Sequence, residues 1–258
     1  MVRNRGSFVS KTTDPARLKS FFRSVQPVTT NVPLIRIGGE GDGGYLVPDD
    51  FEGVKTCFSP GVSDVANFEL NLADRGISCF LADASVEAPP LIHPRFDFEK
   101  KFLGAHTQDI FLSLSDWVAA KSPTDRDMIL QMDIEGAEYE VLYATSEELL
   151  GRFRIIVIEF HDLDRLIDAF SFEYLRLTFE KLTRQFDVVH LHPNNNGRLV
   201  QYGRFFIPPI LEATFLRRDR SSSRLPRTDF PHPLDHANNV DNKRGDLALP
   251  ACWFHDEH

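Results

Sequence analysis

Short apolar runs alternate with longer segments of helical periodicity from Val54 onward. This alternation predicts βαβ units that build an α/β fold with a mostly parallel sheet. The expected strands are Lys55–Phe58, Ser78–Ala82, Met128–Met132, Ile155–Phe160 and Phe186–Leu191. The expected helices are Asn67–Arg75, Glu138–Leu150 and Phe172–Arg184. In open sheets of this kind, ligands bind at the carboxyl ends of the strands.

Composition divides the chain into three segments. Residues 1–33 are expected to form an N-terminal helical extension, and residues 34–218 the main domain. Residues 219–258 are polar and mostly lack periodicity, so we expect a flexible C-terminal tail that docks at Trp253-Phe254.

Several further elements are expected in the first two segments. Thr13-Asp14-Pro15 is typical of a helix start, followed by a helix over Ala16–Val25. Leu34–Ile37 and Tyr45–Val47 flank a glycine-rich turn and predict a hairpin. We expect another strand between Phe96 and Trp117, a helix from near Ser115, and a last strand over Phe206–Leu216.

The composition also excludes some classes of protein. The chain has a net charge of −9, whereas a nucleic-acid surface usually carries a basic patch. No apolar run approaches the ~18 residues that a membrane helix needs, and no apolar signal core follows the N-terminal basic residues. Cys57, Cys79 and Cys252 are too scattered for a disulfide frame, and the first two are expected to be buried thiols. The sequence therefore predicts a soluble, cytoplasmic protein with no nucleic-acid partner and no membrane span, and it leaves a homo-oligomer open.

A small-residue turn, Ser59-Pro60-Gly61-Val62-Ser63, follows the first strand of the alternating region. Asp83 ends the next strand about 20 residues later, at the spacing where a carboxylate can accept hydrogen bonds from ribose hydroxyls. Because the turn has a single glycine, it suits S-adenosylmethionine (SAM) better than a dinucleotide pyrophosphate. An ordinary turn with a surface aspartate is the alternative.

Polar side chains also follow the next two strands. Asp133 and Glu135 come after one strand, and Glu159, His161 and Asp162 end the other. Convergence of these groups allows His161 to act as a general base, or allows the carboxylates and His161 to hold a divalent ion. A salt-bridged strand end without chemistry is the third interpretation.

Acidic residues at a helix start are favoured by the helix dipole, and Glu138 and Glu140 fit that account. His190 and His192 share one face of a later strand, so they either bind a metal or form one packed and one solvated histidine. The turn Asn194–Gly197 can offer amides to a polyol, and Glu212, inside an apolar strand, needs a partner.

Together these motifs resemble the FkbM-like SAM-dependent methyltransferases, over roughly Leu34 to Arg217. The resemblance rests on Arg36-Ile37-Gly38 with Asp42–Val47, on Ser59–Ser63 with Phe68-Glu69, on Ala82–Ser85, on Met132–Glu138 and on Ile158–His161. Pro60 in the glycine turn and the long polar tail depart from the family pattern.

The resemblance implies a Rossmann-like methyltransferase fold with a seven-stranded sheet. SAM would lie over Gly61 with Asp83 at its ribose, while the turn 42–45 would close over its methionine end. The implied cofactor residues are Asp42, Gly43, Gly44, Tyr45, Ser59, Gly61, Asp83, Ala84 and Ser85. Acceptors in such families are often sugars on polysaccharides, sugar nucleotides or natural products, and some relatives use Mg²⁺.

We therefore expect in-line methyl transfer to a sugar hydroxyl, with His161 as the base and Asp133 orienting the acceptor or a metal. The expected substrate-binding residues are Glu135, Glu159, His192 and Asn195, and the candidate metal ligands are Asp133, Glu159 and Asp162. An NAD-dependent enzyme and a non-catalytic module that binds a carbohydrate or a partner protein are the alternatives.

Overall fold

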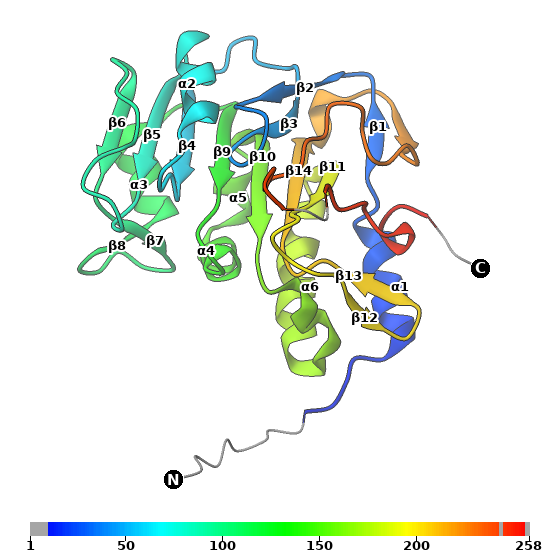
Figure 1. Ribbon diagram of the computed structural model, residues 1–258. Helices are drawn as coiled ribbons and strands as arrows, with labels where there is room; N and C mark the ends of the chain where they lie inside the picture. Colours follow the sequence, from blue (N-terminus) through cyan, green and yellow to red (C-terminus); the bar gives the residue numbers. More distant parts are fainter. Residues whose placement is uncertain (1–9, 243–244, 256–258) are drawn as a thin grey trace.

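A seven-stranded sheet forms the centre of the molecule (Figure 1). The computed structural model describes residues 10–242 and 245–255. The strands lie in the order β11-β14-β10-β9-β4-β5-β6, and β14 is antiparallel to both neighbours whereas the other neighbouring pairs are parallel. Their bounds are β4 (Thr56–Pro60), β5 (Ser78–Ala82), β6 (Phe96–Glu99), β9 (Met128–Met132), β10 (Phe153–Phe160), β11 (Phe186–Pro193) and β14 (Leu211–Arg217). The predicted Rossmann-like α/β fold with a mostly parallel seven-stranded sheet is confirmed.

The strand order reverses between β4 and β9. From β4 the sheet grows outward through β5 and β6, and the chain then returns to β9 and continues to β10 on the other side. Such a switch point opens a crevice at the carboxyl ends of the two central strands. Gly61 follows β4 and Asp133 follows β9, so the reversal brings the two predicted motifs to the same crevice.

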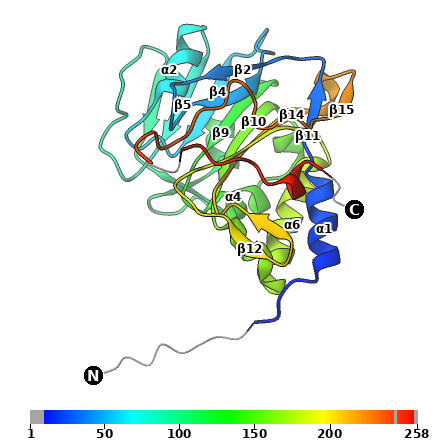
Figure 2. The same cartoon turned by 45° about the vertical axis from the view of Figure 1, so that its right-hand side comes forward.

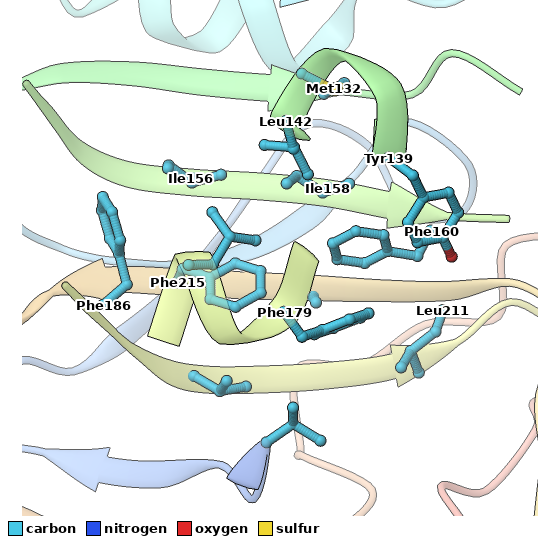
Figure 3. Close-up of a cluster of buried hydrophobic side chains, with 14 of the residues drawn as sticks. Met132, Tyr139, Leu142, Ile156, Ile158, Phe160, Phe179, Phe186, Leu211 and Phe215 are labelled. Carbon is cyan, nitrogen blue, oxygen red and sulfur yellow. The ribbon is translucent and has the colours of Figure 1, made fainter. Parts of the chain in front are cut away.

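The inner strands are buried because the sheet is covered on both faces. Every residue of β9, β10 and β11 is buried, as continuous apolar strands predict. Successive residues of β10 point to opposite faces, so Ile156 and Ile158 belong to one hydrophobic cluster and Ile155 and Val157 to the other. The larger cluster includes Phe160 (Figure 3).

One helix packs on the smaller cluster, and the remaining α-helices pack on the larger one. The first is α2 (Asn67–Asp74), and the others are α1 (Pro15–Ser24), α3 (Leu114–Lys121), α4 (Glu138–Ala144), α5 (Glu147–Leu150) and α6 (Ala169–Thr183). The predicted helix Glu138–Leu150 is two helices, because Thr145 is extended and Ser146 caps α5 by accepting the Leu149 N–H. Within the described residues, no helix has the length and apolar character that crossing a membrane requires.

Short strands pair outside the central sheet. The pairs are β1 (Val28–Thr30) with β15 (Arg224–Pro226), β2 (Leu34–Ile37) with β3 (Tyr45–Pro48), β7 (Phe102–Gly104) with β8 (Phe111–Ser113), and β12 (Val200–Tyr202) with β13 (Phe205–Ile207). The antiparallel pair β2-β3 is the predicted hairpin. The predicted strand Phe206–Leu216 is divided between β13 and β14, because Pro208 and Pro209 have no N–H for a ladder. Three short 3₁₀ helices complete the described elements: η1 (Leu163–Ile167), η2 (Arg218–Arg220) and η3 (Ala251–Trp253).

The described part of residues 219–258 lies against the body of the molecule (Figure 2). Trp253 is fully buried, its ring lies next to Phe21 and Phe22 of α1, and its Nε1 donates to the Phe206 carbonyl at 3.1 Å. Polar composition suggested a flexible tail. Here the polar side chains instead serve as hydrogen-bond partners of the sheet edge, a role that composition alone does not reveal.

Candidate active site

A cavity of about 170 Å³ lies at the switch point between β4 and β9. It is enclosed by the turn of the β2-β3 hairpin, the turn after β4, the first turn of α2 and the end of β9. The lining residues are Asp42, Gly43, Tyr45, Gly61, Val62, Ser63, Asp64, Val65, Phe68, Glu69, Gln131 and Asp133. Of the expected cofactor residues, Asp42, Gly43, Tyr45 and Gly61 therefore line this cavity, whereas Gly44, Ser59, Asp83, Ala84 and Ser85 lie outside its lining.

Glycine is required at position 61 because the backbone after β9 packs closely against it. Its φ of +88° favours glycine, and a Cβ at this position would lie 1.5 Å from the Asp133 carbonyl oxygen. The family resemblance implied that SAM would lie over Gly61. The closest neighbour is instead the backbone that follows β9, so Gly61 allows the two strand ends to meet beside the cavity.

Asp83 organises the two turns next to the cavity. Its carboxylate accepts hydrogen bonds from the Ser63 N–H at 2.9 Å and from the Ser85 N–H and hydroxyl at 2.7 and 2.6 Å. The residue is 5% exposed. Asp83 thus fixes the loop that walls the cavity, and Ser85 is one of its partners.

A buried hydrogen-bond network forms one wall of the cavity. The Gln131 amide donates to the Tyr45 hydroxyl at 3.2 Å, and its carbonyl accepts from the Ser59 hydroxyl at 2.6 Å. Ser59 also contacts the Glu69 carboxyl group, and burial raises the pKa of Glu69 to about 7. Because a hydroxyl has only one proton, both contacts of Ser59 are satisfied when Glu69 is protonated and donates. Sequence reasoning missed Gln131 and the role of Glu69; a glutamine inside an apolar strand was the available signal.

His161 lies just beyond the cavity and is surrounded by carboxylates. Its Nδ1 is 3.1 Å from Glu138 Oε1, and its Nε2 is 3.5 Å from both Glu135 Oε2 and Glu159 Oε1 and 3.9 Å from Asp133 Oδ1. Burial lowers the pKa of His161, but the carboxylates of Glu138, Asp133 and Glu135 outweigh it and raise the pKa overall. Burial raises the pKa of Asp133 to about 7, against the effect of His161. The structure thus brings Asp133, Glu135, Glu159 and His161 together.

Glu138 holds the imidazole in place. Its Oε1 accepts the Ile134 and Gly136 N–H groups at 3.2 and 3.0 Å, and its side chain is fully buried. Sequence position alone predicted only a role at the helix start for Glu138. The bonds to the two amides fit that role, but the contact with His161 adds a second one that spacing did not reveal.

Asp162 does not join this group. Its backbone has a φ of +57°, and its carboxylate lies 2.8 Å from the Arg165 guanidinium and is 53% exposed. The left-handed backbone turns the chain away from the strand direction directly after His161. The expected convergence therefore excludes Asp162.

His192 and Asn195 face the C-terminal segment rather than an open site. The Asn195 amide donates to the Asn239 and Gly245 carbonyls, both at 2.9 Å, and the residue is 3% exposed. His192 is also buried. Glu212 has the partner it needs, since Asn238 donates to it. The C-terminal segment, which the sequence predicted to be a flexible tail, thus covers the end of β11.

Residues 79–186 match the family model described as the methyltransferase FkbM domain. Over these residues the chain is similar to the FkbM methyltransferase domain. It is thus a SAM-dependent methyltransferase, as the resemblance implied, and the match favours SAM over the NAD-dependent alternative. The matched range of the methyltransferase contains Asp83, Asp133, Glu138 and His161.

The methyltransferase is also similar to several solved structures. A chain of the fibrillarin/Nop5p complex shows 15% identity and a TM-score of 0.37, over 64% of this chain and 73% of that one. A mutant form of the 16S rRNA (adenine(1408)-N(1))-methyltransferase from Catenulisporales acidiphilia shows 11% identity and a TM-score of 0.31, over 73% and 98%. No curated protein matches the sequence. Similarities this distant bear on neither acceptor nor mechanism, for which the site geometry is the guide.

Proposed function

We propose that this chain transfers a methyl group from SAM to a hydroxyl group of a sugar. The observation that carries the proposal is the location of Asp133 between the cavity and His161. Asp133 lines the cavity, and its Oδ1 lies 3.9 Å from His161 Nε2. A ligand in the cavity and a hydroxyl beside His161 would therefore share one reaction space.

The cavity suits the methionine end of SAM. SAM carries a positive sulfonium and an ammonium group, and the carboxyl groups of Asp42, Asp64 and Asp133 line the cavity. Whole-ligand pockets usually measure about 300–1,000 Å³, so a cavity of about 170 Å³ fits part of the molecule. The adenosine would then extend past the turns that Asp83 fixes.

The proposed reaction is a direct displacement. SAM, when bound, supplies a methyl group on a positively charged sulfur that needs no further activation. The acceptor oxygen forms a bond to the methyl carbon, the carbon–sulfur bond breaks, and S-adenosylhomocysteine leaves with the bonding electrons. The hydroxyl proton goes to His161 Nε2, while Glu138 holds Nδ1. Alignment of the two reactants supplies a further part of the rate enhancement. The carboxylates that raise the pKa of His161 make this histidine a stronger base. The fraction of His161 in the neutral form, which can accept the proton, increases as the pH rises.

The carboxylates around His161 also favour a class of acceptor. Glu135 is 88% exposed at the cluster, so it is available to a ligand, whereas Glu159 is buried and accepts from the Asn194 amide. Carboxylates accept hydrogen bonds from hydroxyl groups, and they repel phosphates. These groups support a neutral sugar over a sugar nucleotide.

A divalent cation is a second account of the same cluster. Asp133, Glu135 and His161 each offer a ligand atom within 4.8 Å of the others, and Asp133 Oδ1 is buried without a hydrogen-bond partner. Glu159 adds an oxygen at 3.5 Å from His161 Nε2. Asp133, Glu135 and Glu159 supply the carboxylate oxygens that Mg²⁺ prefers, and there the ion would lower the pKa of a bound acceptor hydroxyl.

The test is a methyl-transfer assay with labelled SAM and a panel of neutral glycans and sugar nucleotides. We expect label to enter a neutral sugar with the wild-type chain and not with His161→Ala. Dependence on added Mg²⁺ after EDTA treatment would favour the cation account over His161 as the base. Equal labelling by wild type and His161→Ala would contradict both accounts.

A further inference from the structure

A second histidine–carboxylate cluster lies beyond the residues used for methyl transfer. His190 and His192 of β11 point to the same side, with ring planes at 12° and centroids 6.5 Å apart. Asp235, from the C-terminal segment, reaches both: Oδ1 is 2.8 Å from His190 Nε2, and Oδ2 is 3.7 Å from His192 Nδ1. The three side chains are 3–4% exposed.

The distances fit a shared ligand better than a simple hydrogen-bonded triad. A separation of 3.7 Å is too long for a hydrogen bond between nitrogen and oxygen. Each of the three residues offers a ligand atom within 4.8 Å of the others. Two ligands of one tetrahedral zinc ion lie about 3.3 Å apart, so the ligand atoms would have to move together by at most about 1.5 Å to share one ion.

The charges around the cluster also favour a cation. Glu212 is the register partner of His192 on β14, and Asp246 Oδ1 lies 3.6 Å from His192 Nε2. With Asp235, three carboxylates therefore surround two imidazoles. Such acidic surroundings favour a cation, either a proton on His192 or a divalent metal ion.

The remaining nitrogens of the two rings have no hydrogen-bond partner within the described residues. His192 Nε2 and His190 Nδ1 are both buried and unpartnered. Asp235 Oδ2, by contrast, is oriented by the His232 N–H at 2.8 Å, in the way that backbone groups often orient a metal-binding carboxylate.

We propose that His190, His192 and Asp235 bind a divalent transition-metal ion, with Zn²⁺ as the preferred occupant. Two imidazoles and one carboxylate are a common zinc ligand set, and the nitrogens disfavour Mg²⁺ and Ca²⁺. The ion joins β11 to a segment more than 40 residues later in the chain. Closing such a long loop stabilises the folded chain. The site is structural and does not depend on the proposed methyl transfer.

The C-terminal segment that contains Asp235 also contacts the hairpin turn beside the cavity. The Asn238 carbonyl accepts the Asp42 N–H at 3.1 Å, and the Asn238 amide contacts Glu212. Metal binding at Asp235 would therefore fix the hairpin turn that covers the cavity.

The test uses the untagged full chain, stripped with a chelator and titrated with ZnCl₂ by calorimetry. The His161→Ala background removes the other candidate cluster. We expect one equivalent of Zn²⁺ to bind, and a loss of about 100-fold or more in affinity for Asp235→Asn, since even outer-shell changes cost 10–100-fold. Asp229→Asn is the matched control, because Asp229 is 66% exposed, and it should bind like its parent.

Location is tested independently in crystals of the wild-type chain soaked in Zn²⁺. Anomalous density between His190 and Asp235 is the expected result, and it does not require any variant to fold. Absence of a peak at these residues, or equal zinc affinity of Asp235→Asn and Asp229→Asn, would overturn the proposal and leave an ordinary histidine–aspartate hydrogen bond.

Discussion

The same sheet edge carries two clusters built from the same residue types, yet they differ in surroundings. The His161 cluster adjoins a cavity, contains four carboxylates and includes the largely exposed Glu135. The cluster of His190 and His192 is sealed by the C-terminal segment, and its carboxylate comes from that segment. In Figure 2 this segment runs from β15 back across the molecule to η3.

This difference shows how surroundings assign roles to identical side chains. A group that exchanges protons with a substrate must be reachable, and the His161 cluster is reachable from solvent through Glu135. Histidines held between a strand and a distant segment can join parts of the chain but cannot reach a substrate. The first cluster therefore suits chemistry, and the second suits stability.

The largest expected effects come from replacing one histidine of each cluster by alanine, because one variant should lose catalysis and the other should lose stability. His161→Ala should lower kcat by about 10²–10⁴-fold, the usual contribution of general base catalysis, and leave binding of S-adenosylhomocysteine unchanged. His190→Ala should lower the thermal unfolding temperature in the presence of zinc and leave the chemical step intact. Single-turnover rates and calorimetric melting separate the two. A His161→Ala chain with wild-type turnover would contradict the assignment.

A second prediction concerns the contact that places Asp133 beside the cavity. Gly61→Ala should cost about 3 kcal/mol or more of unfolding free energy, because its Cβ would overlap the Asp133 carbonyl. Gly53→Ala is the control. Gly53 has a φ of +78° and no neighbour within 4 Å of its Cβ position, so only the left-handed strain of about 1–2 kcal/mol applies. Equal losses in urea denaturation would mean that the strand ends do not meet as described.

A third prediction concerns the protonation of Glu69 in the cavity wall. The folded-state pKa of Glu69 is raised from 4.5 to about 7, so folding favours its protonated form. The wild type should therefore lose stability relative to Glu69→Gln as the pH rises from 4.5 through 7. The relative loss should reach about 3 kcal/mol above pH 7. Denaturation curves of both proteins between pH 4.5 and 8 provide the measurement, and parallel pH profiles would show that Glu69 is not buried as a neutral acid.

The smallest expected effect is on cofactor affinity, and it concerns Asp83 next to the cavity. Asp83→Ala should weaken binding of S-adenosylhomocysteine about tenfold, since loss of the bonds to Ser63 and Ser85 loosens the turn and removes a carboxylate from the ribose side. Glu87→Ala, on an exposed side chain, should bind like wild type. Unchanged affinity of Asp83→Ala by calorimetry would remove Asp83 from the cofactor site.

The sequence predicted the sheet well because periodicity and strand burial are local properties. Ser78–Ala82 and Met128–Met132 have the predicted bounds, and the shared edge of the parallel strands explains why Asp133, Glu159 and His161 meet. The sequence could not show that Asp162 turns away to Arg165, because that depends on one left-handed residue.

The role of the C-terminal segment was equally hidden. Asp235 and Asn238 lie in a polar stretch without periodicity, and their partners His190 and Glu212 are far away in the chain. Such long-range polar pairs leave no local pattern. The same limit explains why Glu138 was assigned only to a helix start.

The most direct test of the central claim is a crystal structure of the chain with S-adenosylhomocysteine. The account predicts that the homocysteine end occupies the cavity at Gly61 and that the sulfur faces Asp133 and the His161 imidazole. A ligand bound away from this cavity, or a sulfur that faces away from His161, would contradict the claim that the cavity and the His161 cluster form one active site.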